Sequence, residues 1–108
     1  MRPATLLFRV AVTGPSMEPT VREGDWLLVR QLRRRPRVGE LVIAADPREP
    51  ARLLVKRVSA VTADAVTVSG DRPDRSTDSR QFGALPLSAI LGSPVLRYAP
   101  LDRIGLVR

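Results

Sequence analysis

Short apolar stretches rich in Val, Leu and Ile recur along the chain, separated by turns that contain Gly, Pro, Asp or several Arg. Apolar and polar residues tend to alternate within them, and no helical spacing of three or four residues is sustained. The predicted strands cover residues 6–13, 26–31, 40–45, 52–61, 65–69 and 90–98, with a brief helical turn around residues 87–90. This pattern predicts an all-β fold, one domain over residues 1–108 forming a compact, partly open barrel or folded sheet.

The composition excludes several kinds of catalytic site. The 108 residues include no Cys and no His, which rules out disulfides, thiolate nucleophiles and zinc sites made of His and Cys. A Ser-His-Asp triad cannot form without an imidazole. A serine hydrolase built from this chain therefore needs a different base.

Basic residues outnumber acidic ones by 18 to 11, for a formal net charge of +7. The tract RRRPR, residues 33–37, could contact a nucleic acid. It falls at the tip of a predicted hairpin, however, and no aromatic residue interleaves with it to stack on bases. A solvated turn is the favoured interpretation, and no nucleic-acid partner is expected.

No stretch approaches the roughly 18 apolar residues that are needed to span a bilayer. The N-terminal run ATLLFRVAV is short and carries Arg9, so it reads as the first strand and not as a signal peptide or membrane anchor. We expect a soluble, cytoplasmic protein without stable membrane insertion. Peripheral association with a membrane stays open.

The only lysine lies in the predicted strand RLLVKRVSAV, residues 52–61. With alternating side chains, Leu54, Lys56 and Val58 share one face, which gives the amine apolar neighbours. Arginine, which supplies the other 17 basic residues, stays protonated in proteins, whereas burial lowers a lysine pKa by up to about 3–5 pH units. An inward Lys56 would be a neutral amine able to accept a serine proton. The alternative is a lysine whose amine extends to solvent.

The stretch VTGPSMEPTV places Ser16 after the first predicted strand, close to Gly14, Pro15 and Pro19. Glycine allows a close approach of the backbone, and proline favours an extended residue before it. Together they could hold the serine on a rigid, exposed turn, with its main-chain N–H free to stabilise an oxyanion. The alternative is a hydroxyl that only stabilises its own turn. The polar segment GDRPDRSTDSRQFG, residues 70–83, would suit a surface loop or a network around a buried amine.

In this order, the segments GPSMEPTVREGDWLLV, VGELVIA, LVKRV and GDRPDRSTDSRQFG resemble the sequence boxes of the type I signal peptidase family of Ser–Lys endopeptidases. The resemblance covers nearly the whole chain. It implies the catalytic fold that this family shares with self-cleaving repressors, with Ser16 as nucleophile and Lys56 as general base. The main-chain N–H of Ser16 would be the main oxyanion donor, because Gly14 stands where some relatives carry a hydroxyl.

The resemblance also implies supporting residues and a substrate path. Ser76 would orient the lysine amine, Asp78 and Arg80 would form a structural ion pair, and Gly70 and Asp71 would make the opening turn of the last box. The substrate, a protein precursor, would pair by its backbone with two strands. These strands would contribute Val10, Ala11, Val12, Thr13, Leu53, Leu54 and Val55. No metal or organic cofactor is implied.

Two departures narrow the resemblance. Arg72 stands where the family usually has Asn, and only 14 positions separate Lys56 from Gly70 (70 − 56), which leaves no room for the large inserted domain of some members. A short chain without an evident anchor is most similar to the nickel-type superoxide dismutase maturation protease subgroup. The expected function is removal of an N-terminal leader from the dismutase precursor, with nickel belonging to the substrate.

Three alternatives stay open. The first is a signal peptidase that cleaves secretory precursors at the membrane. The second is a self-cleaving repressor, which is disfavoured because only 15 residues precede Ser16. The third is a non-enzymatic basic β-barrel that binds nucleic acid.

Overall fold

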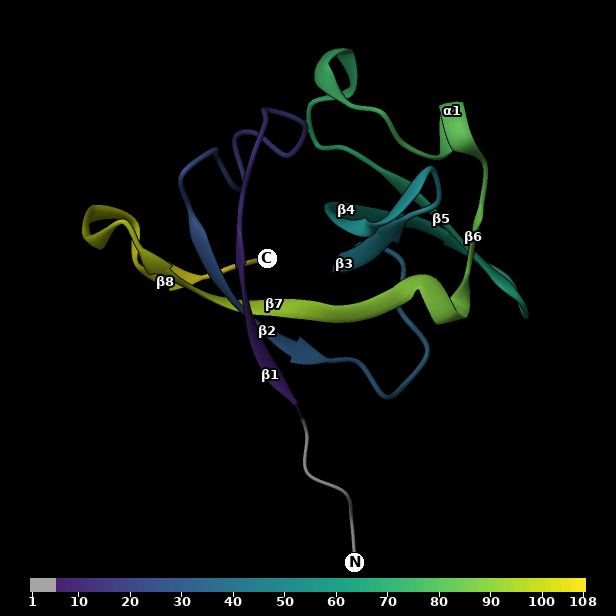
Figure 1. The fold of residues 1–108 in the computed structure, drawn as a ribbon, viewed down its shortest axis with the longest axis horizontal. Coiled ribbons are helices and arrows are strands. Elements are labelled where there is room, and N and C mark those ends of the chain that lie inside the picture. The colour runs from purple at the N-terminus through teal and green to yellow at the C-terminus, as the bar shows by residue number, and fades with distance from the viewer. Residues whose placement is uncertain (1–5) are drawn as a thin grey trace, which may run out of the picture.

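The alternating stretches form strands close to the predicted positions in the computed structural model, which describes residues 6–108 (Figure 1). The six predicted strands correspond to β1 (Leu7–Ala11), β2 (Trp26–Gln31), β3 (Leu41–Asp46), β4 (Glu49–Val61), β5 (Ala65–Ser69) and β7 (Ile90–Ala99). Together with two shorter strands they form one antiparallel sheet that does not close into a barrel. The all-β prediction of a partly open, folded sheet is confirmed. Residues 4 and 5 of the N-terminal apolar run lie outside the described residues.

The elements that the pattern did not predict are all short. They are the strands β6 (Leu85–Pro86) and β8 (Gly105–Leu106), the helix α1 (Ser79–Phe82), and the 3₁₀ turns η1 (Pro73–Arg75) and η3 (Leu101–Arg103). The helical turn expected near residue 87 is the 3₁₀ turn η2 (Leu87–Ala89). Elements of two to four residues contain too few positions to show a period, so tertiary contacts define them.

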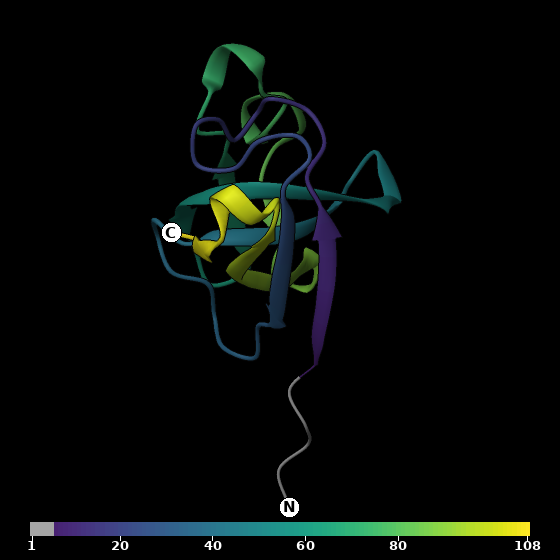
Figure 2. The ribbon, with the colours of Figure 1, turned by 90° about the vertical axis from the view of Figure 1, so that its left-hand side faces the viewer.

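The order of strands in the sheet is β1-β2-β7-β3-β4-β5-β6, and β8 pairs with the end of β7. β2 and β3 are therefore not a hairpin, because β7 lies between them and pairs with both. The prediction that the arginine tract, residues 33–37, caps a hairpin is wrong. The tract lies in a crossing connection at the end of the molecule where β1 begins (Figures 1 and 2). Arg34 is bound there to Glu40 at 2.6 Å.

The folded sheet encloses two apolar clusters, and β3 contributes to both. Leu41 and Ile43 pack into one cluster with residues of β1, β2 and the turn after β1. Val42 and Ala44 pack into the other with residues of β4, β5 and β7. Burial on both faces explains why β3 reads as a continuous apolar run and not as an alternating one.

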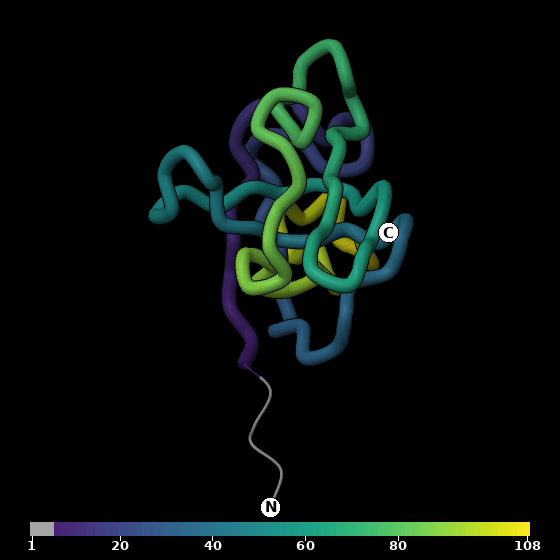
Figure 3. The backbone as a smooth tube through the Cα atoms, turned by 90° about the vertical axis from the view of Figure 1, so that its right-hand side faces the viewer, coloured from purple at the N-terminus to yellow at the C-terminus, as the bar shows by residue number. Residues whose placement is uncertain are grey.

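The two segments with candidate chemistry meet at one end of the sheet. The turn after β1 and the segment that follows β5 both rise to the end away from the start of β1 (Figures 1 and 2). Figure 3, from the side of β5 and β6, shows the second segment looping over that end before it returns to the sheet. The buried carboxylate of Asp25 helps to fix the first segment, since it accepts hydrogen bonds from Arg97 and Arg103 near the C-terminal end.

Candidate active site

Ser16 lies on the turn that follows β1, as the sequence predicts, but it is half-buried and not exposed. The main-chain N–H of Glu18 donates to the carbonyl of Pro15 at 3.1 Å, and the buried side chains of Val12 and Met17 hold the two sides of the turn in the core. Gly14 has a φ of 77°, a conformation that favours glycine. Within residues 6–108, neither the hydroxyl nor the main-chain N–H of Ser16 has a hydrogen-bond partner. The hydroxyl therefore does not stabilise its own turn.

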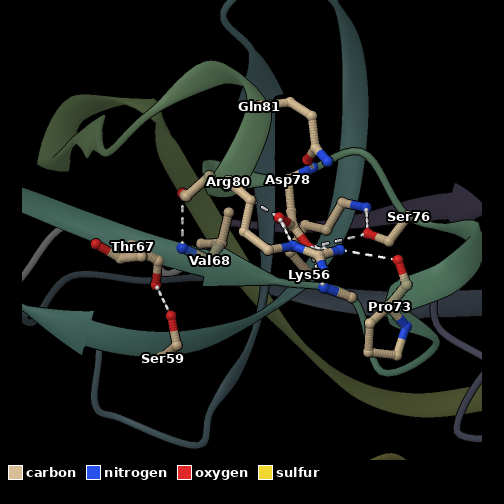
Figure 4. A network of polar contacts seen from close by, with 11 residues as sticks. Lys56, Ser59, Thr67, Val68, Pro73, Ser76, Asp78, Arg80 and Gln81 are labelled. Carbon is tan, nitrogen blue, oxygen red and sulfur yellow. Dashed lines mark hydrogen bonds and ion pairs between the residues drawn. The ribbon is translucent and has the colours of Figure 1, made fainter.

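Lys56 lies on β4 with only 3% of its surface exposed, so the predicted burial is confirmed and the solvent-directed alternative is wrong. Its Nζ donates to the hydroxyl of Ser76 at 2.8 Å (Figure 4). Burial lowers the pKa of the amine, and the charges of Arg48 and Arg80 act in the same direction. The carboxylate of Asp78 opposes them without reversing the result. The amine therefore loses its proton more easily than an ordinary lysine.

Ser76 and Asp78 continue the network away from the lysine. The Ser76 hydroxyl lies 3.3 Å from Oδ2 of Asp78, whose side chain is fully buried and forms an ion pair with Arg80 at 3.0 Å (Figure 4). Burial alone would raise the pKa of Asp78, but hydrogen bonds from Arg80 and from the N–H of Gly70 lower it to about 2. Asp78 also caps α1, reciprocally with Gln81. A permanently ionised carboxylate thus fixes the loop that carries Ser76.

Gly70 joins the lysine network to the Ser16 turn. A Cβ at this position would overlap the side chain of Ser76 and lie 2.7 Å from the main-chain oxygen of Ser16. The next residues make the direct contacts: the N–H of Arg72 donates to that same oxygen at 2.8 Å, and the N–H of Asp71 points to the sulfur of Met17 at 3.4 Å. The absence of a side chain at position 70 allows this close approach.

Asp71 does more than open a turn. Its carboxylate accepts two hydrogen bonds from Arg57, each 2.7 Å long, and one from the hydroxyl of Thr20 at 2.5 Å. Arg57 belongs to β4 next to Lys56, and Thr20 belongs to the Ser16 turn. The carboxylate therefore ties both segments to one point.

Arg72, which stands where the resemblance expects Asn, makes an ion pair instead. Its guanidinium contacts the carboxylate of Glu18 at 2.8 Å and that of Asp74 at 3.8 Å. Glu18 lies two residues after Ser16. Sequence reasoning missed this pair because its members are 54 positions apart, and nothing local to either residue identifies its partner.

Ser16 and Lys56 line one cleft with a volume of about 280 Å³. Its walls are residues 10–17 and residues 52–56, and they include all seven residues predicted to lie beside the substrate. Both walls carry strand edges that are free within residues 6–108: β1 pairs only with β2, and β4 pairs with β5 only from Arg57 onward. Four further lining residues were not identified from the sequence: Arg48, Arg52, Arg75 and Thr77. The three arginines cannot be told apart from the many others by local sequence, and nothing local distinguishes the threonine.

A cleft bordered by free strand edges can accept an extended peptide through backbone pairing. The chain belongs to the signal peptidase family, peptidase S26, whose model matches residues 3–72. That range contains Ser16 and Lys56 but ends before Ser76.

Among its relatives, the mitochondrial inner membrane protease subunit 1 of Xenopus tropicalis is 34% identical over 89% of this chain and 71% of the relative's length. The Arabidopsis thaliana mitochondrial ATP-independent inner membrane protease subunit 1a is 33% identical over 90% of this chain and 73% of its own length. The mitochondrial inner membrane protease subunit 1 of Homo sapiens is 30% identical over 92% of this chain and 74% of its own length.

Two features are not found in residues 6–108. No helix in this range has the length and apolar character that crossing a membrane requires. No three His, Cys, Asp or Glu side chains in it gather as a metal ion would need.

Proposed function

We propose that this protein is a serine endopeptidase in which Ser16 is the nucleophile and Lys56 the general base. The observation that carries the proposal is the state of Lys56. The only lysine of the chain is buried, its pKa is lowered, and it lines the same cleft as a serine hydroxyl without a partner in residues 6–108. Neutral amines in such sites can accept a serine proton.

In the first half of the reaction, an extended substrate pairs with the free edges of β1 and β4. The neutral amine of Lys56 takes the proton of the Ser16 hydroxyl as the oxygen attacks the scissile carbonyl. The main-chain N–H of Ser16 stabilises the developing oxyanion. The resulting ammonium gives its proton to the leaving amine, and an acyl-enzyme remains.

In the second half, a water molecule gives a proton to Lys56 and attacks the acyl carbonyl. The proton returns to the Ser16 oxygen as the ester bond breaks. The same amine serves both halves because burial lowers its pKa, so it gives up a proton more readily than an ordinary lysine. Ser76 holds one direction of the amine, so that another points toward the cleft.

The remaining residues of the network act as positioning residues. Asp78 and Arg80 hold the Ser76 loop, while Gly70 and Asp71 fix that loop against the Ser16 turn. None of these side chains lines the cleft.

The proposed substrate is a precursor protein that loses an N-terminal leader. The motif resemblance favours the nickel superoxide dismutase precursor, processed in the cytoplasm. The relatives named above are subunits of mitochondrial inner membrane proteases, which favours a second candidate, a precursor processed at a membrane. The first assay should therefore include a dismutase precursor and a secretory precursor, each with and without lipid vesicles.

The test compares the wild type with Ser16→Ala and Lys56→Arg, and cleavage is followed by mass spectrometry of the products. Both variants should lose cleavage, because alanine has no nucleophile and arginine keeps its proton. Ser88→Ala, which removes an exposed hydroxyl from η2, is the matched control and should cleave normally. Full activity of Lys56→Arg would refute the assignment of the base.

A further inference from the structure

The cleft that contains Ser16 has a strongly one-sided charge. Besides Lys56, three arginines line it: Arg48, Arg52 and Arg75. Within residues 6–108, no Asp or Glu lines it. The charged side chains that this part of the chain presents to a peptide in the cleft are therefore all positive.

Arg48 is already neutralised by the protein. Its guanidinium makes two hydrogen bonds to the buried carboxylate of Asp46, at 3.0 and 2.8 Å, and its charged end lies 5.6 Å from the centre of the Phe82 ring. Both oxygens of Asp46 are used in this pair. The charge of Arg48 is thus balanced without a substrate.

Arg52 and Arg75 differ from Arg48 in this respect. Both side chains are exposed, and neither forms an ion pair with a carboxylate of residues 6–108. Arg52 contributes weakly to the lowered pKa of Asp46, but Arg48 alone makes the bonds to that carboxylate. These two guanidinium groups remain available to a substrate.

The position of Arg52 fixes where it can contact a peptide. It precedes Lys56 by four residues on β4, and at about 3.3 Å per residue the two lie roughly 13 Å apart along the strand. In the part of the chain that the structure describes, no strand pairs with the outer edge of β4 before Arg57. A peptide strand added there has the same rise per residue. The peptide residue opposite Arg52 is therefore about four positions from the scissile bond.

Arg75 also lines the cleft, and it is the residue before Ser76, whose hydroxyl is bonded to Lys56. The two arginines together make the cleft attractive to a negatively charged segment.

We propose that Arg52 is a specificity-determining residue that selects substrates with an Asp or Glu about four positions from the scissile bond. The proposal rests on the endopeptidase function proposed above and names the class of its substrates, precursors that are acidic near the cleavage site. Arg75 reinforces the attraction without selecting that position.

The first experiment determines the cleavage preference from a peptide library. A chymotryptic digest of a bacterial proteome retains acidic and basic residues inside its peptides, and mass spectrometry of the new termini aligns the cleaved sequences. Wild-type protein should enrich Asp and Glu about four positions from the cut by about two- to fivefold, the size expected of an exposed ion pair. The enrichment should weaken in 1 M salt, where exposed charges are screened within about 3 Å.

Arg52→Glu should abolish the acidic enrichment at that position and replace it with Lys and Arg. Arg30→Glu makes the same change of net charge on β2, outside the cleft, and should keep the wild-type preference. A wild-type profile without acidic enrichment, or one that Arg52→Glu leaves unchanged, would overturn the proposal while leaving the peptidase function intact.

A binding measurement separates the charge preference from catalysis. Ser16→Ala protein is titrated with fluorescent peptides that differ only by Asp or Asn at the selected position, and anisotropy is recorded. The Asp peptide should bind about two- to fivefold more tightly, and Arg52→Gln in the same background should remove the difference. Equal affinities would contradict the proposal. If the Asp peptide binds more tightly while the wild-type protein cleaves no peptide, the charge preference is supported and the proposed peptidase function is wrong.

Discussion

Replacing Asp78 by Asn tests whether the buried carboxylate acts through its charge. The pKa of Asp78 is about 2 in the folded protein, against an ordinary value of 3.8. A difference of one unit between the folded and unfolded pKa corresponds to about 1.4 kcal/mol. The ionised carboxylate therefore contributes about 2 kcal/mol to the free energy of unfolding at neutral pH. Asp78 is fully buried, but the side chain of its partner Arg80 is about half exposed, so solvent screening makes this value an upper bound.

The sign of the pH dependence follows from the direction of the shift. As the pH falls through 3.8 the unfolded chain binds a proton at this position while the native carboxyl stays ionised, so the contribution falls with the pH. Near pH 2 the native carboxyl is half protonated and most of the contribution is lost. Asp78→Asn resembles the protonated acid, and the difference between the two proteins should shrink over the same range.

Urea unfolding followed by far-UV circular dichroism at pH 6, 4, 3 and 2 measures this difference. Other carboxylates with lowered pKa values, such as Asp25 and Asp46, titrate in both proteins and cancel. Asp64→Asn changes an exposed turn residue between β4 and β5 and should match the wild type. A difference that stays constant from pH 6 to pH 2 would refute the argument, because only a steric effect of the amide would then remain.

Three further outcomes are expected. In the pH profile of kcat/KM, Asp78→Asn should move the acidic limb to lower pH, because this carboxylate raises the pKa of Lys56. A limb at unchanged or higher pH would contradict the influence of the Asp78 charge on Lys56. Lys56→Met should abolish cleavage yet raise the free energy of unfolding at pH 7, because burying the lysine charge is unfavourable. The gain should shrink toward pH 10.5, where the unfolded lysine also loses its proton. A variant that unfolds at lower urea concentration than the wild type would contradict the argument that burial of Lys56 is costly. Gly70→Ala should lose at least about tenfold in kcat/KM and stability of about 1–3 kcal/mol, because its Cβ would overlap the side chain of Ser76, while Gly105→Ala, with nothing within 4 Å of its Cβ, should behave as wild type.

The sequence by itself predicted the six longer strands and singled out Ser16 and Lys56 as the proposed nucleophile and base. Alternation is a local property, so β2 and β5 are recovered with their observed bounds. The absence of His and the presence of one lysine restrict the choice of base through composition alone. The apolar neighbours of Lys56 on its strand then predict the burial that is observed.

Only the tertiary structure decided which segments meet. A strand pattern carries no information on its partner, and so the insertion of β7 between β2 and β3 does not follow from it. The ion pair of Glu18 with Arg72 and the close approach at Gly70 depend on distances between segments remote in sequence. The same holds for the charge of the cleft: seventeen arginines look alike along the chain, and folding places Arg52 in the cleft that Ser16 and Lys56 line, without an ion pair to a carboxylate of residues 6–108.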